Sequence, residues 1–189
     1  MDKSVDKVPW YKKIWMWLVD KVKNIDSKIA ILFLATFITF WLWDFIMKIV
    51  IFEPDPSLRS QVSWGIIGWR SLPHDNTTIF ESINIHLSSG GLSAFSCTIA
   101  VVLIIFGIFT KQKWIAFFLG IAVAGVFGNT VDRWWRGYVM DIIYIPWLDK
   151  GTFNFADVFI IAGTAGFGIT LLVLIVKGDK KMRDSEQDG

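Results

Sequence analysis

Four stretches of the chain are apolar over enough consecutive positions to cross a membrane, and charged segments separate them. They occupy roughly residues 29–51, 94–110, 114–131 and 155–176. A spanning helix needs about 20 mainly apolar residues, so each stretch is predicted to be a transmembrane helix. Only Thr110 to Lys113 separates the second stretch from the third, which leaves room for no more than a tight turn. The pattern therefore predicts an all-α membrane protein with four transmembrane helices, the middle two forming a hairpin.

The composition agrees with a membrane protein and excludes several other classes. Hydrophobic residues make up 53% of the 189 positions, 11 residues are Trp, and the mean hydropathy is +0.49. The net charge is only +2, so no strong positive field favours nucleic acid as a partner. Cys97 is the single cysteine, which excludes an intramolecular disulfide.

The basic residues predict how the chain is oriented. Thirteen Lys or Arg residues lie in the N-terminal segment, the hairpin turn and the C-terminal tail, whereas residues 52–93 and 132–154 together hold five. Because Lys and Arg near span ends are retained on the cytoplasmic side, we expect both termini to be cytoplasmic. Residues 52–93 are then an extracytoplasmic domain between the first two helices, and residues 132–154 are a second outside loop.

Three regions follow from this topology. Residues 1–28 are predicted to be a cytoplasmic amphipathic segment that lies along the inner headgroups. Residues 29–176 form the membrane domain, and the charged tail 177–189 is expected to be disordered. Within the outside domain, apolar and polar residues partly alternate over 78–87 between turn-forming clusters, which predicts a small sheet there.

Three acidic residues between the third and fourth spans need a physical reason. Asp157 begins the fourth span with Asn154 three residues before it, so Asn154 is placed as an N-cap and Asp157 as a favourable helix-start acid. Asp132 follows the third span at the unfavourable end of the helix dipole, where Arg133 or Arg136 is available to pair with it. A structural salt bridge explains Asp132 as well as catalysis does.

Asp141 is the acid that local structure does not explain, because apolar residues flank it on both sides in "YVMDIIYI". Charged residues at membrane depth usually mark function, and the loop returns the chain to the outer end of the fourth span. We therefore expect Asp141 and Asp157 to converge and to share one proton. Such a pair provides a base that activates water and an acid that polarises a peptide carbonyl, with no metal or other cofactor.

Other functions remain open at this point. A small ion-coupled transporter also uses acidic residues within the membrane, and a non-enzymatic assembly protein would use Asp–Arg pairs for structure alone. Zinc is disfavoured because His74 and His86 lack the spacing of metal ligands. A serine hydrolase is disfavoured because no Gly-x-Ser-x-Gly motif occurs.

The acidic motifs together resemble signal peptidase II, a family of aspartic peptidases in bacterial membranes. The first motif is Asp44 to Lys48, whose two charged residues also have the spacing of an i,i+4 ion pair. The other three motifs are Gly128-Asn129-Thr130-Val131-Asp132-Arg133, Gly137-Tyr138-Val139-Met140-Asp141, and Phe153-Asn154-Phe155-Ala156-Asp157-Val158-Phe159-Ile160. Their order and the predicted topology agree with that family over about residues 29–176.

The resemblance implies a function and a set of site residues. Asp141 and Asp157 would be the catalytic pair, and a supporting set would shape the site and hold the substrate. That set is Asn129, Asp132, Arg133, Asn154, Asp44 and Lys48. The implied substrate is a diacylglyceryl-modified prolipoprotein, cut just before the lipidated cysteine. The implied setting is the bacterial cytoplasmic membrane with the site on its outer side, where a monomer would meet membrane lipid and lipidated substrates.

Overall fold

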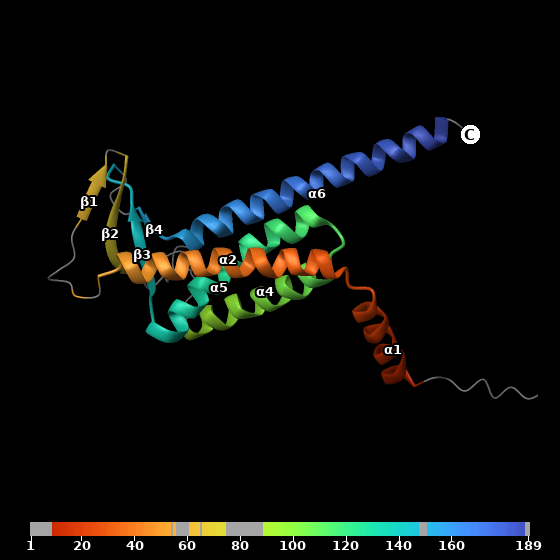
Figure 1. Cartoon of the computed structure of the whole chain (residues 1–189), viewed down its shortest axis with the longest axis horizontal. Helices are drawn as coiled ribbons and strands as arrows, with labels where there is room; N and C mark the ends of the chain where they lie inside the picture. The colour runs from red at the N-terminus through yellow and green to blue at the C-terminus, as the bar shows by residue number, and fades with distance from the viewer. Residues whose placement is uncertain are drawn as a thin grey trace, which may run out of the picture.

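The computed structural model describes residues 9–53, 55, 61–64, 66–74, 89–147 and 151–187, and the elements within them form a helical bundle with a small sheet at one end (Figure 1). The helices are α1 Trp10–Lys23, α2 Ser27–Ile51, α4 Ser89–Phe109, α5 Lys113–Arg136 and α6 Phe155–Gln187. The strands are β1 Gln61–Trp64, β2 Ile67–His74, β3 Val139–Tyr144 and β4 Thr152–Phe153.

The prediction of four spanning helices is confirmed. Among the described residues, α2, α4, α5 and the segment Phe155–Gly178 of α6 are long and apolar enough to cross a membrane. The turn between α4 and α5 is limited to residues 110–112, as the hairpin prediction required. The chain is therefore a multi-pass membrane protein.

Two helix ends differ from the predictions. Helix α5 continues to Arg136, so Asp132 and Arg133 lie in its last turns and not in the outside loop. The hydropathy pattern predicted that the span ends at the first charged residue, whereas Asp132 is buried and pairs with Lys48 of α2. The predicted disorder from Lys177 onward is wrong through Gln187, because α6 continues over those positions. Several residues of this tail, such as Lys, Arg, Glu and Gln, favour helices.

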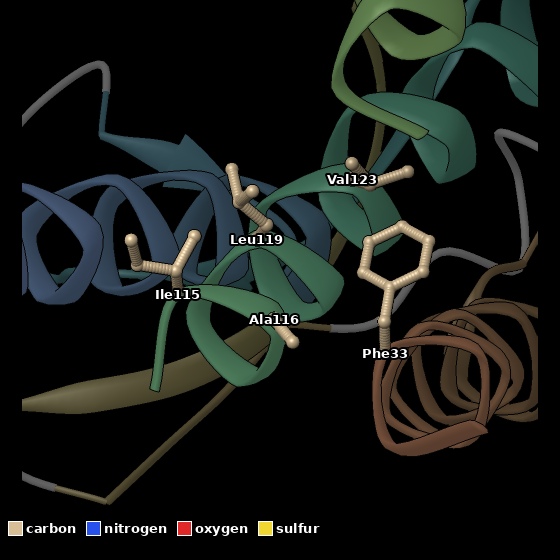
Figure 2. Close-up of a cluster of buried hydrophobic side chains, with 5 residues drawn as sticks. All are labelled: Phe33, Ile115, Ala116, Leu119 and Val123. Atoms are coloured by element: carbon tan, nitrogen blue, oxygen red, sulfur yellow. The ribbon is translucent and has the colours of Figure 1, made fainter. Parts of the chain in front are cut away.

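Helix α5 is the centre of the bundle. Its most apolar window is 67% buried, against 17–22% for the other three spans. Its inner face packs on Phe33 of α2 through a cluster of Ile115, Ala116, Leu119 and Val123 (Figure 2). Close approach is possible because Gly120 faces α2, where an added Cβ would lie 2.9 Å from the backbone oxygen of Phe33. Such small residues are typical of packed membrane helices.

The sheet combines both connections that were predicted to lie outside. Its order is β1-β2-β3-β4 and all three pairings are antiparallel. Strands β1 and β2 come from the segment between α2 and α4, and β3 and β4 come from the segment between α5 and α6. The prediction of a small sheet is confirmed, but the strand expected at 78–87 lies outside the described residues. In the sheet, Leu72 of β2 is the partner of Asp141 of β3.

Candidate active site

A cluster of buried polar side chains joins the sheet ends of α2, α5 and α6, and Lys48 lies at its centre. The Lys48 ammonium lies 2.7 Å from Asp44 Oδ2, which confirms the predicted i,i+4 pair, and 2.8 Å from Asp132 Oδ2. Lys48 and Asp44 are each 1% exposed. Charges removed from water to this extent must be paired, so the lysine stabilises each of the two carboxylates and is stabilised by them.

Asp132 also pairs with an arginine of its own helix. Its Oδ1 lies 2.8 Å from an Arg136 guanidinium nitrogen, while the backbone N–H of Met140 donates to its Oδ2 at 3.5 Å. The sequence offered both Arg133 and Arg136 as partners of Asp132, and Arg136 is the arginine that forms the ion pair. Asp132 thus connects α2, α5 and the start of β3.

Asp44 holds the beginning of α6 against α2. Its Oδ1 accepts a hydrogen bond at 2.8 Å from the backbone N–H of Ala156, which is one of the first amides of α6. The first amides of a helix lack hydrogen-bond partners within that helix. The bond to Asp44 therefore satisfies an N–H donor that would otherwise be buried without a partner. Gly128 makes room for it, because an added Cβ there would lie 2.7 Å from Asp44 Oδ2.

Asn129 connects the charged cluster to the two aspartates of the predicted pair. Its Oδ1 accepts from Lys48 Nζ at 3.2 Å and from Asn154 Nδ2 at 3.1 Å. Its Nδ2 donates to Asp157 Oδ1 at 2.7 Å. Since two donors converge on the amide oxygen, the amide nitrogen is directed at Asp157.

Asp157 and Asn154 form a reciprocal cap at the start of α6. The Asp157 backbone N–H donates to Asn154 Oδ1 at 3.0 Å, and the Asn154 backbone N–H donates to Asp157 Oδ2 at 3.1 Å. This is the geometry of a capping box with Asp in the acidic position. The predicted helix-start role of Asp157 is therefore confirmed. Because Asp157 stays half-buried while Asn154 is fully buried, the Asp157 carboxylate is the more accessible of the two groups.

Asp141 lies in the middle of β3 and is 3% exposed. Its Oδ1 accepts from Asn154 Nδ2 at 3.1 Å, and its Oδ2 accepts from the Thr152 hydroxyl at 3.2 Å. One residue, Asn154, is thus bonded to both Asp141 and Asp157. Asn154 therefore links the two aspartates, and their action as a pair that shares one proton stays a prediction.

Arg133 lies at the side of this cluster. Its guanidinium donates to the backbone oxygen of Asn129 at 3.3 Å, and it interacts electrostatically with the carboxylates of Asp157, Asp132 and Asp141. Its Nε is buried and has no hydrogen-bond partner among the described residues. A buried N–H donor of this kind is suited to donate a hydrogen bond to an oxygen atom of a ligand.

Sequence reasoning missed Thr152, which donates to Asp141 from β4. The available signal was its position two residues before Asn154, because alternate residues of an extended segment share a face.

The described residues contain no group of three or more His, Cys, Asp or Glu side chains placed to hold a metal ion. His86, one of the two histidines considered, lies outside the described residues.

Comparison with known protein families shows which family the chain belongs to. The family model described as signal peptidase (SPase) II matches residues 35–174, a range that contains all eight site residues discussed above. The chain belongs to the signal peptidase II family. The resemblance carried by the acidic motifs is thereby confirmed.

Individual members of the signal peptidase II family match over shorter segments. The chain is 34% identical over 87 residues to the lipoprotein signal peptidase of Clostridium tetani, covering 43% of this chain and 53% of that protein. It is 30% identical over 112 residues to the lipoprotein signal peptidase of Escherichia fergusonii, covering 48% and 68%. For the first of these relatives, the chain spans about half of the curated protein's length.

The fold of this signal peptidase II family member is also found among solved structures. One, titled as a bacterial membrane enzyme structure by the in meso method at 1.9 Å resolution, superposes with a TM-score of 0.63 at 21% identity. The match covers 78% of this chain and 94% of the other. The overall fold is therefore shared with a protein described as a bacterial membrane enzyme.

Proposed function

We propose that the protein is a membrane aspartic endopeptidase that removes signal peptides from diacylglyceryl-modified prolipoproteins. Membership of the signal peptidase II family and the names of its relatives support this substrate. The single observation that carries the proposal is that Asn154 bonds to both carboxylates. Its amide donates to Asp141 Oδ1 and its backbone N–H donates to Asp157 Oδ2, each at 3.1 Å.

In this proposal Asp157 activates the water. Its two oxygens accept N–H bonds from Asn129 and Asn154, and its carboxylate is the more accessible of the pair. It takes a proton from the water as the water oxygen attacks the scissile carbonyl carbon. The donors around Asp157 and the start of α6 favour a negative charge at that position.

Asp141 is then the protonated partner. It is almost fully buried on a strand flanked by apolar residues, an environment that favours a neutral carboxyl group. Its proton polarises the scissile carbonyl, and the proton passes to the leaving amine as the C–N bond breaks. The Arg133 Nε, which has no partner among the described residues, is placed to donate to a substrate carbonyl oxygen.

The position of the site fits a substrate that arrives from the bilayer. Asp141 belongs to β3 and Asp157 to the first turn of α6. Figure 1 shows the sheet at one end of the helical bundle, next to the start of α6. Most lysines and arginines lie in the N-terminal segment, the hairpin turn and the C-terminal tail, so that end of the bundle would be cytoplasmic and the site would face the outside. Diacylglycerol tails then remain between the helices and the lipid while the peptide bond reaches the carboxylates. This assigns residues 52–93 and 132–154 to the extracytoplasmic side.

The test is cleavage of a purified diacylglyceryl precursor peptide by purified protein in lipid nanodiscs. Asp141→Asn and Asp157→Asn should each reduce kcat by at least about 10³-fold, because each removes one half of the acid–base chemistry. Asp26→Asn is the matched control, since Asp26 caps α2 at the other end of the bundle and Asn caps equally well. It should cleave like the unchanged protein.

Two further measurements separate the alternatives. Thermal unfolding of each variant shows whether lost activity comes from lost structure, and unchanged cleavage in either Asp variant would remove that residue from the chemistry. An unmodified precursor should be cleaved far more slowly than the lipidated one. If the unchanged protein cleaves neither peptide but conducts ions in liposomes, the peptidase proposal is wrong and the transporter function takes its place.

A further inference from the structure

A cavity lies at the end of the bundle opposite the carboxylates, between α1 and α4. Its volume is about 720 Å³, within the range of small-molecule sites. The end of α1 and Asn24 line one side, and the end of α4 with Lys111 of the following turn lines the other. Figure 1 shows α1 and the α4–α5 turn at the end of the molecule away from the sheet. We refer to this space as the α1–α4 cavity.

The wall that α4 contributes is apolar and continuous. Val102, Ile105, Phe106 and Phe109 line the cavity, and their spacing of three, four and seven residues places them on one helix face. They are 39–58% exposed, so the other described elements cover this face only in part, with Phe106 also in ring contact with Phe167 of α6. Because these residues belong to a membrane span, a hydrocarbon chain is the ligand that this wall suits.

The mouth of the cavity is basic. Lys21 lies on α1 and Lys111 lies in the turn after α4, so cations approach from both sides. The Lys21 ammonium is 5.9 Å from the centre of the Trp17 ring, which also lines the cavity. Asp20 is the one carboxylate in the described lining, and its Oδ1 accepts from Asn24 Nδ2 at 3.1 Å. The net charge of the mouth is therefore positive.

This combination of one apolar wall and two lysines matches an anionic phospholipid. Lysines near a membrane surface attract anionic lipid headgroups, and Trp and Lys side chains are suited to the boundary between headgroups and acyl chains. Helix α1 itself exposes several large apolar residues that favour this boundary, namely Trp10, Tyr11, Ile14, Trp15 and Met16.

We propose that the α1–α4 cavity binds one anionic phospholipid, with its phosphate between Lys21 and Lys111 and an acyl chain along the α4 face. The bound lipid bridges α1 to the bundle and fixes the helix in the plane of the membrane surface. Helix α1 precedes residue 35, where the match to the signal peptidase II family begins. The site is thus partly built by a segment outside the family match, and it does not depend on the proposed peptidase activity.

The experiment uses the full-length protein in nanodiscs that contain a trace of photoactivatable phosphatidylglycerol or photoactivatable phosphatidylcholine with the same acyl chains. After illumination, the labelled peptides are identified by mass spectrometry. The phosphatidylglycerol probe should label peptides around Trp17 and Phe109 several times more than the phosphatidylcholine probe. Lys21→Gln with Lys111→Gln should reduce this labelling roughly tenfold, because both headgroup contacts are lost.

Lys12→Gln with Lys13→Gln is the matched control, because it removes the same charge from exposed positions of α1 that do not line the cavity. Labelling that persists in this control and falls in the cavity variant supports a defined site. Equal labelling by the two probes would overturn the proposal. So would an equal fall in both double variants, since that result indicates general surface attraction. Unchanged melting temperatures of both double variants verify that the bundle is intact.

Discussion

The interface between α2 and α5 has two halves that are built in opposite ways. In the half nearer α1, Phe33 packs against Ile115, Ala116, Leu119 and Val123 with no polar group in the cluster (Figure 2). In the half nearer the sheet, the same two helices meet through Asp44, Lys48, Asn129 and Asp132. One pair of helices thus carries an apolar contact at one end and a charged contact at the other.

The difference shows how a bundle of apolar helices accommodates buried charges. Apolar packing between helices tolerates small changes in fit, because neighbouring side chains can relax partly into the gap. A buried charge has no such freedom, since it must be paired in a fixed geometry. The charged half therefore positions Asn129 and the start of α6, which hold Asp157, while the apolar half holds the two helices together.

The largest effect is expected at Lys48. Lys48→Met keeps most of the side-chain volume but leaves Asp44 and Asp132 buried without their shared cation, which should cost about 3–5 kcal/mol of unfolding free energy. Unfolding of the purified protein in increasing denaturant measures this loss. Adding Asp44→Asn to Lys48→Met should recover part of the stability, because one uncompensated charge is removed. A double variant no more stable than the single would contradict the electrostatic origin of the loss.

The apolar half should respond less. Phe33→Ala removes a fully buried ring, and we expect a loss of about 2–3 kcal/mol, below the usual range for soluble cores because lipid also solvates the unfolded helices. Cleavage of the lipidated precursor at a temperature where the variant is folded should stay within a few fold of normal. A large loss of cleavage in folded Phe33→Ala would show that the two halves are not separable.

A smaller and more local effect is expected at Gly128. Gly128→Ala places a methyl group 2.7 Å from Asp44 Oδ2, so the carboxylate must shift, at a cost of about 1–3 kcal/mol. The bond from Asp44 to Ala156 is disturbed with it, and we expect kcat to fall more than KM rises. Gly168→Ala is the matched control, because nothing lies within 4 Å of its added Cβ. Equal kinetics in the two variants would contradict the close contact.

The smallest effect is expected at Gly137, which ends α5 with a left-handed φ of 84°. Gly137→Ala adds a side chain in a conformation that disfavours it, and should lower the unfolding free energy by about 1 kcal/mol. Gly178→Ala, a helical position with open space around it, should be neutral or slightly stabilising. Thermal unfolding of both variants makes this comparison, and equal melting temperatures would count against strain at Gly137.

Several features were predictable because they depend on local spacing. The four spans follow from runs of apolar residues, the Asp44–Lys48 pair from its i,i+4 separation, and the cap formed by Asn154 and Asp157 from the first turn of a helix. Each of these needs only the geometry of one element. The end of α5 was missed because hydropathy treats a charged residue as exposed, whereas Asp132 is buried by partners on other elements.

The sequence by itself determined which segments are apolar enough to cross the membrane, and it identified the acidic groups that are proposed to carry the chemistry. The tertiary structure decided which groups meet: Asp132 pairs with Lys48 and Arg136, Asn129 is held between Lys48 and Asp157, and Thr152 donates to Asp141. It also decided that the two connections predicted to lie outside share one sheet. The physical reason is that these contacts join residues far apart along the chain, where their geometry is set by how helices and strands pack and not by any period in the sequence.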